Sequence, residues 1–169
     1  MDKNIKQLQY EQRNQDGFEE KIVQVNRVSK KTQGGNKIGF SVLMVVGNKS
    51  GKVGVGLGKA GDVSSAIRKG ASLARKHVIE VSIINGTIPF EFYIKLGAAK
   101  VILKPAPTGS GVIAGGAVRS VVSLAGIQNI SSKVLGTDNQ ASNVYATIEA
   151  LDRLTKRYKR EKDLRKGKK

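Results

Sequence analysis

Apolar and polar positions in the first half of the chain predict an antiparallel meander followed by one helix. Residues 19–28 are rich in β-branched side chains, residues 38–46 form the most apolar run of the protein, and residues 52–57 fit a third strand. The length and composition of the run at 38–46 favour a central strand that is covered on both faces. Residues 29–37 are polar and contain a Gly-Gly pair, so we expect a loop there.

A helix is expected to follow the third strand. Asp62 is its expected N-cap, and the apolar positions from Val63 to Ala74 recur every three or four residues. Basic residues occupy the other side of this helix. It should therefore bury one face against the sheet and present a cationic face to solvent. Residues 79–84 should be extended and end at the turn pair Asn85-Gly86.

The second half predicts the order β-β-α-β-α. The Gly97-Ala98 pair joins the first two strands, a glycine-rich loop covers residues 105–116, and Gly126 stops the first helix. The last helix opens near Ser142, with an apolar stripe at 3–4 spacing. The expected elements are strands at 88–96, 100–104 and 127–135, and helices at 117–125 and from 142 onward.

These patterns predict an α+β fold made of two small domains. The first has the order β-β-β-α, and the second has the order β-β-α-β-α. The expected boundaries are a flexible N-terminal extension at 1–17, a first domain at 18–84, a second domain at 87–158 and a basic C-terminal tail at 159–169.

The charge of the chain calls for a polyanionic partner. Its 169 residues carry 30 Lys and Arg against 13 Asp and Glu, a net charge of +17. Residues 21–37 hold five bases and no acid, whereas bases and acids balance over residues 105–150. A folded basic face with a basic tail can neutralise phosphates and release counterions. With no cysteine, no apolar run long enough for a membrane helix and no signal-like start, we expect a cytoplasmic protein.

One glycine motif imitates a dinucleotide site. Gly56, Gly58 and Gly61 match G-x-G-x-x-G between a strand and a helix, and Glu80 follows about 20 residues later. An antiparallel meander lacks the crevice that a dinucleotide occupies, so we favour another use. The glycines would let a polyanion backbone approach the helix N-terminus, with Lys59 as a point charge. A nucleotide-dependent enzyme remains the alternative.

The sequence gives little support for catalysis. His77 is the only histidine and stands beside Lys76, so a surface residue is a better interpretation than a general base. The acids do not cluster as metal ligands would, and we expect no cofactor and no metal. Aromatic residues are few, which favours recognition of structured RNA through phosphate and ribose over base stacking. We therefore expect a binding protein and not an enzyme.

Specific strings carry a family resemblance. VNRVSKKTQGGNKIGFSVLMVVGNKSGKVGVGLGKAGDVSSAIRKG, KPAPTGSGVIAGGAVRSVVSLAGIQN and NVYATIEAL resemble the bacterial small-subunit ribosomal protein number five, the S-five family. The match runs from about Phe18 to Leu154, in register across both halves. It implies an N-terminal domain similar to double-stranded-RNA-binding domains and a C-terminal domain of the ribosomal S-five type. It also implies a structural protein of the small ribosomal subunit that binds ribosomal RNA and contacts ribosomal proteins S-four and S-eight. It also implies a place near the messenger RNA entry and an influence on translational accuracy.

The resemblance and the charge pattern together assign candidate residues. Ser29, Lys30 and Lys31 match the tip of a family loop that reaches toward the head–body hinge, with Gly34 and Gly35 as its turn. Gly109 and Arg119 match family positions that affect accuracy through the contact with S-four. The full expected RNA-binding set is Arg27, Ser29, Lys30, Lys31, Gly34, Gly35, Lys37, Lys52, Lys59, Lys69 and Lys76. A free-standing double-stranded-RNA chaperone outside the ribosome is a further alternative.

Overall fold

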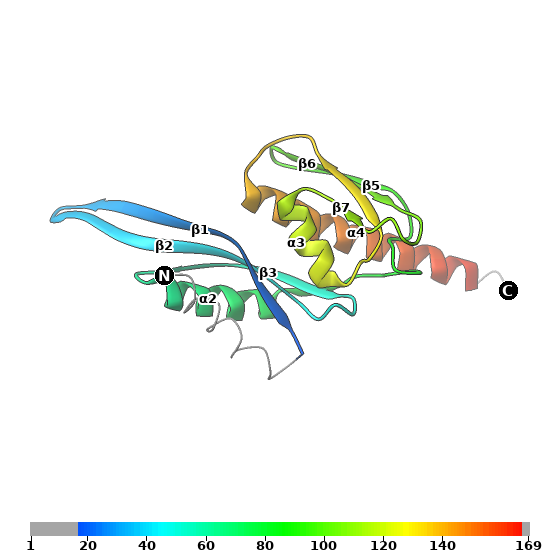
Figure 1. Cartoon of the computed structure of the whole chain (residues 1–169), viewed down its shortest axis with the longest axis horizontal. Coiled ribbons are helices and arrows are strands. Elements are labelled where there is room, and N and C mark those ends of the chain that lie inside the picture. Colours follow the sequence, from blue (N-terminus) through cyan, green and yellow to red (C-terminus); the bar gives the residue numbers. More distant parts are fainter. Residues whose placement is uncertain (1–16, 167–169) are drawn as a thin grey trace.

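The N-terminal half forms an antiparallel sheet with one helix packed on it. The structure of the protein is a computed structural model, and it describes residues 17–166. The strands lie in the order β1-β2-β3-β4, and α2 covers one face of the sheet (Figure 1). The elements are β1 Glu19–Thr32, β2 Gly35–Gly47, β3 Lys52–Ala60, α2 Val63–Lys76 and β4 Val78–Glu80.

The C-terminal half is a second sheet with two helices. Its strands lie in the order β5-β6-β8-β7, where β7 runs parallel to β8 and the other pairs are antiparallel. The elements are β5 Phe92–Leu96, β6 Ala99–Pro105, β7 Val112–Ile113, α3 Gly116–Ala125, β8 Ile130–Val134 and α4 Gln140–Lys166. The α+β fold that the sequence predicts is confirmed.

One hydrophobic core joins the two halves. Leu43 and Val45 of β2 and Val53 and Val55 of β3 belong to the same buried cluster as residues of α3, α4, β6 and β8. Two backbone hydrogen bonds also connect the halves. Lys49 N–H donates to the Leu124 carbonyl at 2.9 Å, and Gly51 N–H donates to the Ala125 carbonyl at 2.8 Å. The centre of the first sheet is thus buried on both faces.

α2 covers the other face of this sheet, and its backbone lies unusually close to β3. Gly54, Gly56 and Gly58 alternate along β3 and share the face that α2 occupies. A Cβ at Gly56 would lie 2.2 Å from the Gly70 carbonyl oxygen, and one at Gly58 would lie 2.0 Å from that of Ala66. The glycines therefore admit helix backbone, and the expectation that Gly56 and Gly58 cradle a polyanion or a dinucleotide is wrong.

The predicted start and amphipathic character of α2 are confirmed. The Asp62 side chain accepts a hydrogen bond from Ser65 N–H at 2.7 Å, as an N-cap should. This hydrogen bond to the carboxylate lowers the pKa of Asp62. Ala66, Gly70, Ala71 and Ala74 form the buried stripe of the helix.

The loop predicted at 29–37 is instead the end of a long hairpin. β1 continues to Thr32 and β2 begins at Gly35, with Thr32 and Gly35 as the last register pair. Side chains there are exposed on both faces, so the residues lack the alternation that reveals a half-buried strand. β3 likewise runs three residues past its predicted end, to Ala60, and Val78–Glu80 adds a fourth strand.

Three expectations for the C-terminal half need correction. β5 starts at Phe92 and not at residue 88, since Pro89 has no N–H for a ladder. The glycine-rich loop contains the short strand β7, so the parallel unit is β7-α3-β8, and β6 pairs antiparallel with β8. α4 starts at Gln140, before Ser142. Residues 159–166 of the basic tail continue α4, in line with the helix expected there, and residues 1–16 of the expected extension lie outside the described residues.

The turn signals are confirmed. Asn85 and Gly86 both have positive φ and are enclosed by the Ile84–Thr87 bridge. Gly126 ends α3 in the left-handed conformation, and Gly97 turns the chain between β5 and β6. Within residues 17–166, no helix combines the length and the apolar character needed to cross a membrane.

The glycine motif offers a stability test with an internal control. In Gly58→Ala the new methyl would meet the Ala66 carbonyl, so α2 must shift, and we expect a loss of about 3 kcal/mol in the free energy of unfolding. A Cβ at Gly61 meets nothing within 4 Å, so Gly61→Ala should change stability by less than about 0.5 kcal/mol. Urea unfolding of both variants measures the difference, and equal effects would contradict the close packing of α2.

Candidate nucleic-acid interface

The β1–β2 hairpin projects from the body of the molecule (Figure 1). Residues 25–38 are exposed, yet the backbone stays paired as far as Thr32 and Gly35. At the tip the Thr32 hydroxyl donates to the Gly35 carbonyl at 2.9 Å, and Gly35 adopts a φ of +118°. The chain thus holds an extended arm in shape by backbone pairing without burying it.

Cations lie on both faces of this hairpin. Lys30 and Lys37 are register partners, so their side chains share one face. Arg27, Ser29 and Lys31 have the opposite parity along β1 and share the other face. All five side chains are exposed. A polyanion could therefore be contacted from either side of the arm.

The remaining predicted cations are divided among three other places. Lys59 is the register partner of Ser41 and lies at the root of the hairpin, on the face that looks toward the C-terminal half. Lys69 and Lys76 are exposed on α2, which covers the opposite face of the same sheet. Lys52 lies at the far end of β3, about 23 Å along the strand from Lys59 at roughly 3.3 Å per residue.

Lys52 has a different environment from the hairpin cations. Its register partner is Glu80, whose carboxylate also accepts a hydrogen bond from Lys159 at 2.8 Å. The bond from Lys159 and its charge, with a further contribution from Lys52, lower the pKa of Glu80. The structure therefore does not gather the predicted set into one surface, and Lys52 belongs to a mixed-charge junction between β4 and α4.

The glycine-rich loop is anchored by a buried side chain that sequence analysis did not single out. Asn129 is 4% exposed, and its Oδ1 accepts hydrogen bonds from Gly109 N–H at 2.9 Å and Gly111 N–H at 3.2 Å. Gly109 itself is exposed with a φ of +93°. An asparagine before a strand is too common a feature to reveal this role without the tertiary structure.

Arg119 is connected to the same loop. It is exposed near the start of α3, and its Nη2 donates to the Val112 carbonyl at 3.1 Å. Val112 pairs with Ile130, next to Asn129. Gly109 and Arg119 thus lie on one continuous segment that Asn129 and β8 hold in place.

Groups that would support catalysis are not assembled in the described part of the chain. His77 caps the C-terminus of α2 through its backbone N–H, and its side chain is exposed. Within residues 17–166, no three His, Cys, Asp or Glu side chains gather as metal ligands would. What the structure presents is an exposed cationic arm and an anchored neutral loop.

Comparisons with known proteins agree over nearly the whole chain. Residues 18–82 match the family model of the ribosomal protein S5 N-terminal domain, and residues 94–164 match that of the ribosomal protein S5 C-terminal domain. A small ribosomal subunit protein uS5 of Thermotoga maritima is 51% identical over 150 residues, which cover 89% of this chain and 82% of that protein. The uS5 protein of Thermosipho africanus is 53% identical over 137 residues, covering 81% of this chain and 78% of its own length.

Asn129→Ala tests how the loop is held. The variant removes one acceptor and leaves two loop N–H groups without their partner, so we expect a loss of about 2 kcal/mol in unfolding free energy. Hydrogen exchange should accelerate at Gly109 and Gly111 and stay unchanged at Gly97. Asn36→Ala, at an exposed position on the hairpin, is the control and should leave both readouts unchanged. Unaltered exchange at Gly109 in Asn129→Ala would refute the anchor.

Proposed function

The chain belongs to the ribosomal protein S5 family, and from this premise we propose that it is a structural constituent of the small ribosomal subunit that binds small-subunit ribosomal RNA. The resemblance to this family that the sequence carries is confirmed. The family consists of ribosomal structural proteins, so the prediction that the chain is not an enzyme is also confirmed.

The cationic hairpin is the single observation that best supports RNA binding. Arg27, Lys30, Lys31 and Lys37 stand on an arm whose exposed residues 25–38 include no acid. The side chains of this arm bury no apolar surface that would stabilise it, and their charges repel one another until a polyanion neutralises them. Ser29 adds a hydroxyl for phosphate, and Gly34 and Gly35 make a narrow turn. Double-helical or tertiary RNA presents the phosphates and ribose hydroxyls that suit these groups.

The other predicted cations would make secondary contacts. Lys69 and Lys76 on α2 and Lys59 beside the hairpin are exposed and carry no ion pair within residues 17–166. Lys52 is a weaker candidate because it stands beside Glu80. We propose that the hairpin makes the main RNA contact and that α2 extends it.

The neutral segment at residues 105–150 would meet neighbouring proteins. Residues 105–150 carry as many acids as bases, and Gly109 and Arg119 present an anchored, exposed segment there. We assign this segment to the contact with ribosomal protein S-four, through which the protein would influence accuracy. The protein would also contact ribosomal protein S-eight and lie near the messenger RNA entry. The place of action would be the ribosome in the cytoplasm.

Lys30→Ala/Lys31→Ala tests the hairpin. Loss of two phosphate contacts should weaken binding to small-subunit ribosomal RNA and reduce the slope of log affinity against log salt by about 2, with sequence preference unchanged. Filter binding between low and moderate salt measures the slope. Lys95→Ala/Lys133→Ala removes the same charge from the second sheet and is the matched control, expected to leave the slope near that of the unaltered chain. Equal slopes for the two variants would overturn the hairpin assignment.

Gly109→Arg tests the neutral segment. Its φ of +93° strains any side chain, and the added cation cannot repel RNA, so we expect a larger loss of binding to S-four than to ribosomal RNA. Gly97→Arg places the same residue at another exposed turn with positive φ and should spare both partners. Pull-down of S-four and filter binding of RNA give the two affinities. Equal loss of both partners in Gly109→Arg would contradict the assignment.

A further inference from the structure

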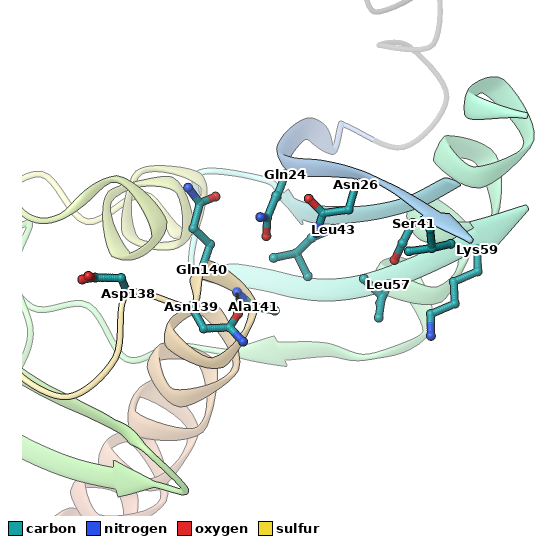
Figure 2. Close-up of a pocket in the computed structure, with 11 residues that line it drawn as sticks. Gln24, Asn26, Ser41, Leu43, Leu57, Lys59, Asp138, Asn139, Gln140 and Ala141 are labelled. Carbon is teal, nitrogen blue, oxygen red and sulfur yellow. Dashed lines mark hydrogen bonds between the residues drawn. The ribbon is translucent and has the colours of Figure 1, made fainter. Parts of the chain in front are cut away.

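A cleft of about 470 Å³ opens at the root of the hairpin, between the first sheet and the start of α4 (Figure 2). Two cross-strand rows form its sheet side. Asn26, Ser41 and Lys59 are register partners in one row, and Gln24, Leu43 and Leu57 are partners in the next. The other side consists of residues 138–141, which lead into α4.

Ser41 is the feature that points to a ligand. The residue is 8% exposed and lines the cleft, and its hydroxyl has no hydrogen-bond partner within residues 17–166. Its oxygen is not one of the fully buried unpaired atoms of the described residues, which are Ser132 Oγ and Asn143 Oδ1, so it stays open to the cleft. A polar atom in such a setting is hydrogen-bonded by a ligand or a water. The Ser41 hydroxyl is therefore available to a group that enters the cleft.

Hydrogen-bond donors face the cleft from both sides. Asn139 Oδ1 accepts from Ala141 N–H at 3.0 Å and from Ser142 N–H at 3.5 Å, which leaves the amide Nδ2 of Asn139 to donate. The first turn of the 27-residue helix α4 also contributes the positive end of its dipole. Lys59 adds an exposed ammonium across the gap, and the Asp138 carboxylate points away from the sheet in Figure 2. An anionic group is favoured at this place.

The rest of the cleft suits a flat ring. Leu57 and Ala141 supply apolar surface, with Leu43 buried beneath, and the amides of Gln24 and Gln140 lie on opposite sides of the gap (Figure 2). Side-chain amides can hydrogen-bond the edges of an unstacked base. The volume lies in the range of roughly 300–1,000 Å³ that small-molecule pockets occupy, which fits one nucleotide and excludes a duplex.

The same sheet face leads from the hairpin cations to the cleft. Lys30 and Lys37 form a row on this face, the Val28–Gly39 pair follows, and the row of Asn26, Ser41 and Lys59 comes next. An RNA strand held by the hairpin can therefore continue along one face into the cleft. This continuity favours RNA over a protein segment as the occupant.

We propose that the cleft binds a single unpaired RNA nucleotide, with its phosphate between Ser41, Lys59 and the start of α4 and its base between Leu57 and Ala141. The proposal rests on the proposed RNA-binding function and adds a site for one flipped or single-stranded nucleotide. It predicts that the chain recognises unpaired RNA at the hairpin root as well as phosphates along the arm.

The test uses the full chain and a pool of single-stranded RNA hexanucleotides. Ser41→Ala removes one hydrogen bond and should weaken binding about fivefold, while its stability stays equal or rises because no partner is lost. Lys59→Gln should reduce the salt slope by about 0.7, the value for one contact to a single strand. Ser72→Ala and Lys95→Gln are the matched exposed controls, on α2 and β5, and should bind as the unaltered chain does. NMR shifts should move at Gln24, Asn26 and Gln140.

Two outcomes would overturn the cleft site while leaving the proposed function intact. In the first, Ser41→Ala binds normally and the shifts stay confined to the hairpin. In the second, cleft resonances respond to deletion of residues 1–16 and not to RNA, which would make the chain's own N-terminal segment the occupant. Failure of the unaltered chain to bind small-subunit ribosomal RNA would instead refute the proposed function itself.

Discussion

Burial of the first sheet on both faces is the constraint on which the rest of the structure depends. On one face α2 lies so close to β3 that Gly54, Gly56 and Gly58 leave no room for a side chain. On the other face Leu43, Val45, Val53 and Val55 join the core of the C-terminal half. Residues 42–47 of β2 are buried by these two contacts, and Ser41, at their edge, lines the cleft. Only the outer parts of β1 and β2 remain free, and they become the arm that carries the cations.

The same double coverage separates two kinds of surface. The arm lies beyond both covering layers and carries charge without an apolar face, so its use is electrostatic. The loop of Gly109 lies in the C-terminal half and is held by Asn129, and acids and bases balance over residues 105–150. The cleft lies where the layers end, and it therefore combines the apolar edge of the core at Leu43 and Leu57 with the polar row of Asn26, Ser41 and Lys59. RNA and protein partners can thus be accommodated on different parts of a small chain.

Sequence patterns predict those elements whose buried faces, caps or turns can be recognised from a few neighbouring residues. The stripe of α2 and its Asp62 cap, the apolar run of β2 and the Asn85-Gly86 turn are all of this kind. The hairpin beyond residue 28 leaves no such signal, because its pairing is set by backbone register and its side chains meet only solvent. The spacing of Gly56, Gly58 and Gly61 is ambiguous in the same way, since close approach by a helix and by a phosphate both require a missing Cβ. The candidate cations of the arm follow from composition, whereas Asn129 and the cleft depend on segments that meet only through tertiary packing.

The backbone contact between the halves has a mechanical consequence. β2 runs unbroken from the hairpin tip to Gly47, where a Cβ would lie 2.3 Å from the Leu124 carbonyl of α3, and Gly126 meets Lys49 as closely on the other side. With 13 residues at roughly 3.3 Å each, β2 is about 43 Å long, and its junction with α3 lies at its C-terminal end. A small tilt of β2 at this junction therefore gives a larger displacement of its other end, at the hairpin tip. A displacement of α3 at this junction is therefore passed along β2 to the hairpin tip, without a hinge between the two.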